Sequence, residues 1–297
     1  MDIDVIFPQV FPANYWGFLY KRKHPEIPCL WYCHEPSAFV HNYEIINGLD
    51  EPMKTLALVS NPIMKQIDKY IVNFADKVLT NSFFSSNNIK RIYNRDSIVV
   101  YPGVDISKFR PVEKKENYIF SIGRLTKFKR MDLLLKSMVH LKGKNISLYI
   151  GGDGEEKNNL VSMSKELGIF DDVTFLGKVP ESQLNSYYSK AKTVIFPTNG
   201  EPFGIVPIEA MASGTPIIAG INGGVVESVI DGVTGYLVDP TDTDSLVMKI
   251  NEVVTNPDLC SLMSKNARTH VEKNFTWDLT TKRLHEFMTF SMKKWDQ

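Results

Sequence analysis

The sequence has few cysteines, no surplus of charge and no long apolar run, and each absence excludes a class of protein. Three cysteines in 297 residues are too few and too oddly spaced for a disulfide framework or a zinc site. Lys and Arg together number 34, as do Asp and Glu, so no basic surplus supports general nucleic-acid binding. No apolar run approaches membrane-spanning length, and the amino terminus has no signal-peptide pattern. We therefore expect a cytoplasmic protein, with any membrane contact being peripheral.

Short β-branched runs alternate with longer amphipathic segments, which is the pattern of βαβ units around a parallel sheet. In the first third the sequence predicts strands at Ile3–Phe7, Pro28–Cys33, Lys77–Thr80 and Ser97–Val100, and helices at Pro52–Asn73 and Ser82–Tyr93. There is no internal repeat and no low-complexity tract.

A turn at Pro102-Gly103, followed by Pro111 and a charged stretch, interrupts this alternation and predicts a domain boundary after residue 110. Beyond it the predicted strands are Tyr118–Ile122, Ser147–Gly151, Val173–Leu176, Thr193–Phe196, Pro216–Ala219 and Gly235–Val238. The predicted helices are Met131–Leu141, Glu155–Leu167, Glu181–Lys190, Ile205–Ser213, a short one near Val225–Ile230 and a last one opened by Trp277. We therefore predict an α/β protein of two doubly wound, Rossmann-like lobes that face each other, residues 1–110 and 111–276, with ligands at the carboxyl ends of the strands.

The stretch EPFGIVPIEAMASG, residues 201–214, predicts an anion site at the start of a helix. Pro207 suits the first helical turn and Gly214 the position just past the end. The amides at the start of this helix have no intrahelical partner, and the helix dipole favours a negative charge beside them. They are the amides of Phe203, Gly204 and Ile205.

Two glutamates flank this helix start. We expect Glu209 in the first turn, where its carboxylate can accept hydrogen bonds from hydroxyl groups beside the anion, and Glu201 on the loop at the other side. A diphosphate between two polyhydroxyl groups would use all three features. The alternative is that Glu209 only complements the dipole, which contributes about 0.3–1 kcal/mol, and that Glu201 is a solvated loop acid.

A second candidate is the stretch SIGRLTKFKR, where Gly123 ends a strand and four cations precede the next helix. They are Arg124, Lys127, Lys129 and Arg130. Cations beside the positive end of a helix favour an arriving anion, and an arginine can hold a diphosphate with two parallel hydrogen bonds. A solvated basic loop is the alternative. The stretch IGGDGEE, residues 150–156, is read as a tight turn that brings Gly152 close to a nucleotide, whereas Gly223-Gly224 is read as a turn without a ligand.

Together these motifs resemble the retaining glycosyltransferases of family 4, the group 1 transferases, which have two Rossmann-like lobes in the GT-B arrangement. The second lobe carries the match, from YIFSIGRLTKFKRMDLLLKS through GEPFGIVPIEAMASGTPIIA to the helix at Trp277, and VVYPGVDISKF looks like the family's interlobe linker. The resemblance also implies that the last helix, residues 277–297, packs back on the first lobe.

The resemblance implies a role for each motif residue. Arg124 and Lys129 would hold the donor's diphosphate, Glu209 would accept hydrogen bonds from the ribose hydroxyls, and Glu201 would hold the transferred sugar. His34, in WYCHEPSAF, matches the family's first-lobe histidine near that sugar, although the residues alone favour a strand-end histidine with a local partner. The implied catalytic set is His34, Arg124, Lys129 and Glu201, and the donor-binding set adds Gly123, Gly152, Val179, Phe203, Gly204, Ile205 and Glu209. Neither a metal nor a cofactor is implied, because the cations replace the divalent metal of other transferases.

One departure from the family is the start of the chain, MDIDVIFPQVFPANYW, which looks like a middle strand of the first lobe. We therefore expect an incomplete first lobe, and a partner chain that supplies the absent strands is one explanation. A catalytically silent sugar-nucleotide-binding subunit is the alternative function, and an epimerase on the same architecture is a third.

The donor is expected to be GDP-mannose or UDP-glucose by analogy, and the acceptor a saccharide or a lipid-linked acceptor in polysaccharide biosynthesis. The basic stretch YKRKH, residues 20–24, offers either a membrane contact or a solvated helix end.

Overall fold

The computed structural model describes residues 3–42, 46 and 49–293. Its contacts divide the chain into two compact units, one made of Met1–Tyr101 with Thr280–Gln297 and the other of Pro102–Leu279. The sequence predicts a division after residue 110, whereas the contacts group the chain from Pro102 onward with the second unit.

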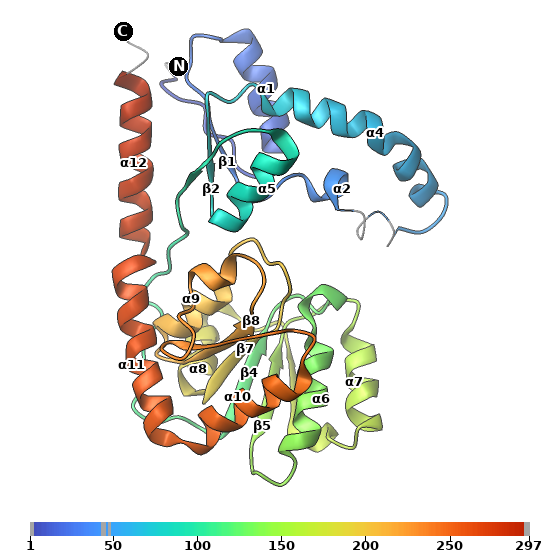
Figure 1. Cartoon of the computed structure of the whole chain (residues 1–297), viewed down its shortest axis with the longest axis vertical. Helices are drawn as coiled ribbons and strands as arrows, with labels where there is room; N and C mark the ends of the chain where they lie inside the picture. Colours follow the sequence, from blue (N-terminus) through green and yellow to red (C-terminus); the bar gives the residue numbers. More distant parts are fainter. Residues whose placement is uncertain (1–2, 43–45, 47–48, 294–297) are drawn as a thin grey trace. The chain divides into compact units, whose positions relative to one another are not determined.

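The second unit is built on a six-stranded parallel sheet with the order β6-β5-β4-β7-β8-β9 (Figure 1). Its strands are β4 (Tyr118–Ile122), β5 (Ser147–Gly151), β6 (Val173–Gly177), β7 (Thr193–Phe196), β8 (Ile217–Gly220) and β9 (Gly235–Val238). The chain starts in the middle with β4, moves outward to β6, then returns to β7 on the other side of β4. The order therefore reverses between β4 and β7, which is where doubly wound sheets bind their ligands.

Helices cover both faces of this sheet because the side chains of each strand alternate between the faces. Ile119 of β4 joins the core cluster that contains Leu134 of α6 and Ile250 of α10. The next residue, Phe120, points to the opposite face, where its ring stacks on that of Tyr187 with centroids 5.5 Å apart. The helices are α6 (Met131–Leu141), α7 (Lys157–Glu166), α8 (Glu181–Lys190), α9 (Ile205–Ala212), α10 (Thr243–Thr255) and α11 (Pro257–Asn274), with 3-10 turns η1 (Lys127–Lys129), η2 (Phe170–Asp172) and η3 (Gly224–Glu227).

The first unit contains a smaller parallel sheet with the order β1-β2-β3. Its strands are β1 (Leu30–Cys33), β2 (Lys77–Thr80) and β3 (Ile98–Val99), and its helices are α1 (Ala13–Lys23), α2 (Ala38–His41), α4 (Met53–Val72) and α5 (Phe83–Tyr93). The last helix, α12 (Trp277–Lys293), contributes Leu284 and Phe287 to the cluster of Tyr32, Leu79 and Val100. The predicted end of this helix, residues 294–297, lies outside the described residues. None of the described helices combines the length and the apolar character needed to cross a membrane.

Several predicted elements differ from the structure, mainly in the first unit. The segment Ile3–Phe7 forms no strand of its own: Ile6 and Gln9 make isolated bridges to Cys29 and Tyr32, because Pro8 lacks the amide donor that a continuous ladder needs. The strand expected at Ser97–Val100 shortens to Ile98–Val99. The helix expected near Val225–Ile230 is the 3-10 turn η3.

No helix was predicted at α2, and the helix end considered at residues 20–24 was the one indication of α1. The α1 segment ANYWGFLYKRK combines a glycine with aromatic residues, which are poor helix formers, so its own propensity is low. Tertiary packing decides its conformation, through contacts such as the ring of Phe18 against that of Phe74.

Candidate active site

The loops that follow β4 and β7 bring Lys129, from the basic stretch after β4, close to Glu201. Lys129 Nζ donates to Glu201 Oε2 at 2.7 Å, and the two side chains are 19% and 21% exposed. The same ammonium lies 5.2 Å from the ring centroid of Phe196, the last residue of β7. Because β4 and β7 are neighbours in the sheet, this pair lies at the point where the strand order reverses.

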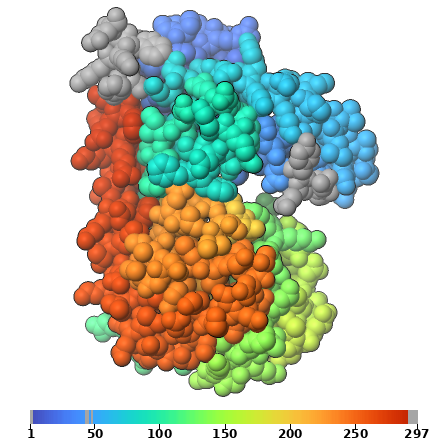
Figure 2. Space-filling view, in the orientation of Figure 1, coloured from blue at the N-terminus to red at the C-terminus, as the bar shows by residue number. Residues whose placement is uncertain are grey.

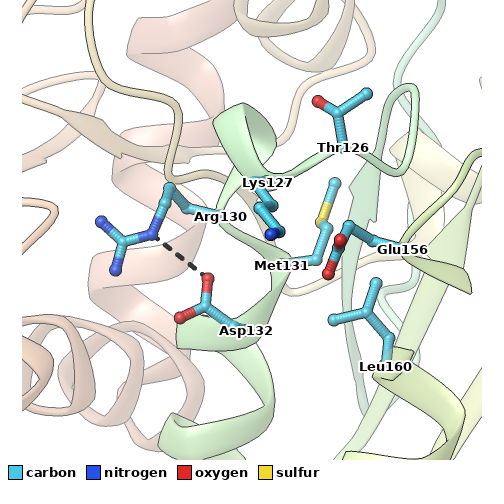
Figure 3. Close-up of a pocket in the computed structure, with 7 residues that line it drawn as sticks. All are labelled: Thr126, Lys127, Arg130, Met131, Asp132, Glu156 and Leu160. Atoms are coloured by element: carbon cyan, nitrogen blue, oxygen red, sulfur yellow. Dashed lines mark hydrogen bonds and ion pairs between the residues drawn. The ribbon is translucent and has the colours of Figure 1, made fainter. Parts of the chain in front are cut away.

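The other three cations of the β4 loop make no contact with Glu201 among the described residues. Arg124 is exposed, and its side chain makes no hydrogen bond or ion pair with any residue that the structure describes. Lys127 and Arg130 line a pocket of about 240 Å³ whose other walls come from the starts of α6 and α7 (Figure 3). Arg130 Nε pairs there with Asp132 Oδ1 at 3.2 Å. Two cations, Arg124 and Lys129, therefore remain for a ligand at the carboxyl ends of β4 and β7.

Glycines allow the β4 and β5 loops to approach each other closely. Gly152 has a φ of +118°, and a Cβ on it would lie 1.8 Å from the carbonyl oxygen of Gly123. The Leu125 amide donates to the Asp153 carbonyl at 3.0 Å, so the β4 loop is tied to its neighbour on both sides of Arg124. Val179, from the loop before α8, packs against Gly151 at the same edge of the sheet. These loops are therefore fixed by backbone contacts that require glycine.

Helix α9 begins directly beside the Glu201 loop, and its first amides are open. Gly204 caps the helix with a φ of +88°, a conformation that favours glycine. The amides of Gly204 and Ile205 donate to no residue in the described part of the chain. Phe203 is buried beneath them, with 2% of its surface exposed, whereas Ile205 is 42% exposed. An anion bound here would meet free donors and the positive end of the helix dipole.

Glu209 does not lie in the first turn, as the sequence predicts, because α9 starts at Ile205 and its first turn holds no acid. Glu209 is instead one turn further along, where it accepts a hydrogen bond from the hydroxyl group of Tyr188 at 2.8 Å. Burial raises the pKa of the Glu209 carboxyl, although the Tyr188 hydroxyl and the Lys108 ammonium lower it. Because Glu209 lies beyond the first turn, its position excludes a role in complementing the helix dipole. Its other oxygen, Oε1, has no protein donor among the described residues and is available to accept from a ligand.

The Gly223-Gly224 turn holds the Glu201 loop in place. The Gly224 amide donates to the Glu201 carbonyl at 2.7 Å, and a Cβ on Gly224 would lie 2.0 Å from the Pro202 carbonyl oxygen. The double glycine is explained by this close approach.

His34 belongs to the first unit. It follows β1, its ring lies 4.8 Å from that of Tyr32, and burial lowers its pKa below the ordinary value for histidine. Burial therefore favours the neutral imidazole.

Sequence reasoning missed two residues that surround Glu209. Tyr188 of α8 is fully buried, and Lys108, which precedes β4, pairs with Glu181 at the start of α8. In the sequence, Tyr188 stands beside Tyr187 with nothing to distinguish the two, so only the helix phase shows which hydroxyl group meets the carboxylate.

No cluster of three or more metal-binding side chains occurs among the described residues.

Comparison with known proteins adds a family and several relatives. The family described as "Glycosyl transferases group 1" matches residues 104–270. D-inositol 3-phosphate glycosyltransferase of Mycolicibacterium smegmatis is 30% identical to this chain. The alignment covers 93% of this chain and 65% of that protein. The protein of the same name from Mycobacterium marinum is 29% identical, with 92% and 61% covered. The chain thus spans less than two thirds of the length of these relatives.

Solved structures share the fold. Sucrose-phosphate synthase from Thermosynechococcus elongatus has a TM-score of 0.80 at 23% identity, over 97% of this chain and 73% of that one. Anabaena HepE, crystallised in complex with UDP-glucose, has a TM-score of 0.80 at 20% identity, over 96% and 78%. These likenesses confirm the predicted α/β fold of the GT-B type.

Proposed function

The chain belongs to the group 1 glycosyltransferase family, and from the geometry of its second unit we propose that it is a retaining hexosyltransferase that uses a nucleotide-diphosphate sugar as donor. The observation that carries the proposal is the meeting of Lys129 and Glu201 at the carboxyl ends of β4 and β7, beside the open amides at the start of α9. A cation, an acid and free peptide donors at one edge of the sheet suit a ligand that has both phosphate and hydroxyl groups.

The diphosphate would bind between Lys129, Arg124 and the amides of Gly204 and Ile205. Without a ligand, Lys129 and Glu201 neutralise each other at 2.7 Å. An arriving diphosphate competes for the ammonium and so releases the Glu201 carboxylate toward the hydroxyl groups of the sugar. The exposed Arg124 guanidinium adds a second cation, as the side chain has no other described partner.

Glu209 would hold the ribose. Its Oε2 is occupied by the Tyr188 hydroxyl, which leaves Oε1 to accept from the ribose hydroxyl groups. The glycine-rich β5 loop at Gly152 and the loop at Val179 would lie along the nucleoside, where their backbone groups contact it.

Catalysis then follows from the charges that develop in the reaction. Cleavage of the bond between the anomeric carbon and the diphosphate oxygen places positive charge on the sugar and negative charge on the leaving diphosphate. Arg124, Lys129 and the α9 amides stabilise the negative charge as it forms, which is the part a divalent metal plays in other transferases. The acceptor hydroxyl attacks the anomeric carbon from the face that the diphosphate leaves, and its proton passes to a leaving phosphate oxygen, so the configuration is retained.

By family resemblance alone, we assign His34 a role in holding the transferred sugar through one hydrogen bond of its imidazole. The donor is a UDP- or GDP-hexose, with UDP-glucose supported by the complex of the structural neighbour HepE and GDP-mannose by family analogy alone. The names of the sequence relatives include a phosphorylated inositol acceptor. For this chain we propose a saccharide or lipid-linked acceptor.

A thermal-shift screen of UDP-glucose, GDP-mannose and the corresponding ADP-sugars tests the proposal, because a ligand that binds only the folded state raises Tm. We expect one nucleotide sugar to raise Tm and to be consumed in the presence of an acceptor. Arg124→Ala and Glu209→Ala should abolish both effects in proteins that remain folded, and full activity in those variants would contradict the site. Binding by calorimetry with no transfer would favour the sugar-nucleotide-binding subunit instead.

A further inference from the structure

The ammonium group of Lys129 lies over the rings of two phenylalanines. Its Nζ is 5.7 Å from the ring centroid of Phe128, the residue before it, and 5.2 Å from that of Phe196, the last residue of β7. A cation over the face of an aromatic ring is attracted by the ring quadrupole when it lies within about 6 Å of the centroid. Two such contacts, added to the ion pair with Glu201, restrict where this ammonium can go.

The stem of Lys129 is held as well. A Cβ on Gly123 would lie 3.8 Å from Lys129 Cδ and 3.9 Å from its Cγ and Cε. The methylene groups therefore run over the glycine at the end of β4, where no side chain competes with them. Only 19% of the Lys129 side chain is exposed.

The two rings have different surroundings. Phe196 is 3% exposed, and a Cβ on Gly204 would lie 3.2 Å from its Cε1, so this ring also lies beside the start of α9. Phe128 lies in the turn η1 and is 41% exposed. The contact with Lys129 is the one ring interaction that Phe128 makes among the described residues. Core packing therefore explains Phe196, whereas the contact with Lys129 is what the structure shows for Phe128.

A ring face suits a lysine that must bind phosphate. An ammonium is strongly hydrated and stands on a flexible stem of four carbons. A ring attracts its charge and displaces water, but accepts at most a weak hydrogen bond from it. The N–H donors that Glu201 does not use thus remain available to phosphate oxygens. A lysine that is already held also loses less freedom when the ligand arrives.

From these contacts we propose that Phe128 and Phe196 are positioning residues for diphosphate binding. Their rings, which we call the Lys129 clamp, hold the ammonium at the carboxyl ends of β4 and β7, where it exchanges Glu201 for a phosphate group. The rings act through Lys129 and need not touch the donor. This inference rests on the proposed function, because it requires a nucleotide diphosphate at this place.

Calorimetric titration of Phe128→Leu with UDP and with GDP tests the clamp. Leucine is apolar but has no ring face, so Lys129 must be ordered when the ligand binds, and Kd should rise by roughly two- to twelvefold. Phe128→Tyr and Phe128→Trp keep the face and should bind as the wild type does. Phenylalanines with one, two and three ring fluorines at this position should raise Kd stepwise, because fluorine withdraws charge from the ring face.

A double-mutant cycle separates positioning from direct contact with the ligand. In Lys129→Met the ring has no ammonium to hold, so adding Phe128→Leu should not change Kd further. A ring that stacks on the nucleotide itself would lower the affinity by the same factor with and without Lys129.

Phe170→Leu is the matched control. Phe170 is 43% exposed, and the Nζ of Lys165 lies 5.2 Å from its ring centroid. It belongs to η2, which directly precedes β6 and so lies at the amino ends of the strands. In Figure 2 the yellow-green atoms of α7 and of this turn lie at the surface of the second unit. Phe170→Leu should bind both nucleotides with the wild-type Kd.

Three results would overturn the clamp in variants that circular dichroism shows to be folded. They are a wild-type Kd in Phe128→Leu, an equal loss of affinity in Phe128→Tyr and Phe128→Trp, and an undiminished effect in the Lys129→Met background. If the wild type binds neither UDP nor GDP, the proposed function fails and this inference fails with it. Nucleotide binding by the wild type with an unaffected Phe128→Leu contradicts the inference alone.

Nuclear magnetic resonance of the protein with lysines labelled at Cε provides a readout that needs no nucleotide. Ring currents should move the Lys129 Cε protons upfield, and Lys129→Met assigns their signal. Phe128→Leu should remove much of this shift, whereas Phe170→Leu should leave it in place. An unchanged Lys129 signal in Phe128→Leu would refute the contact on which the inference depends.

Discussion

Removing the hydroxyl group of Tyr188 tests whether the orientation of Glu209 matters for donor binding. In Tyr188→Phe the carboxylate loses the donor that lies 2.8 Å from Oε2, while the buried ring keeps its contacts with Phe109 and Phe120. Glu209 can then rotate, and its Oε1 is no longer held toward the ribose. The loss also removes one of the two groups that lower the pKa of Glu209.

The magnitude follows from the hydrogen bond between Glu209 Oε1 and the ribose, which the rotated carboxylate would no longer make; the Tyr188 bond is present with and without nucleotide and cancels. A hydrogen bond to a charged group contributes about 1.5–3 kcal/mol. With about 1.4 kcal/mol for each tenfold change in affinity, the expected rise in Kd for the nucleotide is roughly 10- to 150-fold. The turnover number should change less, because Glu209 lies away from the bond that breaks.

Calorimetric titration with UDP and with GDP measures this effect. Tyr187→Phe is the matched control, since the neighbouring tyrosine stacks on Phe120 and makes no contact with Glu209 among the described residues. The corresponding 2′-deoxynucleotide sharpens the test. In the wild type it should bind more weakly than the ribonucleotide, and in Tyr188→Phe this discrimination should largely disappear.

The reasoning fails if folded Tyr188→Phe binds the nucleotide with the wild-type Kd and keeps its preference for ribose. A loss of affinity equal for the ribose and deoxyribose forms would also count against it, since that result indicates a general disturbance of α8 and α9.

Four further predictions concern the same unit. Lys129→Met should lower turnover by roughly 10²–10³-fold, measured in single-turnover assays, whereas Lys127→Met should be close to wild type because Lys127 lines a different pocket. Burial raises the pKa of Glu209, so nucleotide affinity should fall as the pH drops through that raised pKa and the carboxylate is protonated. Calorimetry at several pH values should show this fall in affinity in the wild type and not in Glu209→Gln. The same shift means that the ionised group destabilises the fold at neutral pH, so Glu209→Gln should raise Tm there, with a gain that shrinks toward acid pH. Gly152→Ala should lower the free energy of unfolding by about 1–3 kcal/mol or more, because its Cβ would lie 1.8 Å from the Gly123 carbonyl oxygen. Gly177 also has a positive φ, but the space around it is open, so Gly177→Ala should lower the free energy of unfolding by less. Urea titrations measure both changes.

Local patterns predicted the second unit well because its strands and helices carry strong signals. The bounds of β4, β5 and β7 agree with the predicted ones, and Gly214, with a φ of +67°, follows the end of α9 as expected. The first unit was harder, as Pro8 interrupts its first extended segment and α1 has little intrinsic helix propensity. Periodicity also predicted the helix at Pro52–Asn73, but it could not indicate which side is buried. That side depends on Asp68 and its three hydrogen-bond partners, which come from elements far apart in the chain.

The sequence by itself determined the alternation of strands and helices, the helix between Gly204 and Gly214, and the residue types at the strand ends. These depend on backbone preferences and side-chain patterns within a few residues. Only the tertiary structure decided that β4 lies beside β7, which brings Lys129 to Glu201 across 72 residues of sequence, and that Tyr188 and not Tyr187 meets Glu209. Strand order and helix phase are set by packing between distant segments, and no local pattern contains that information.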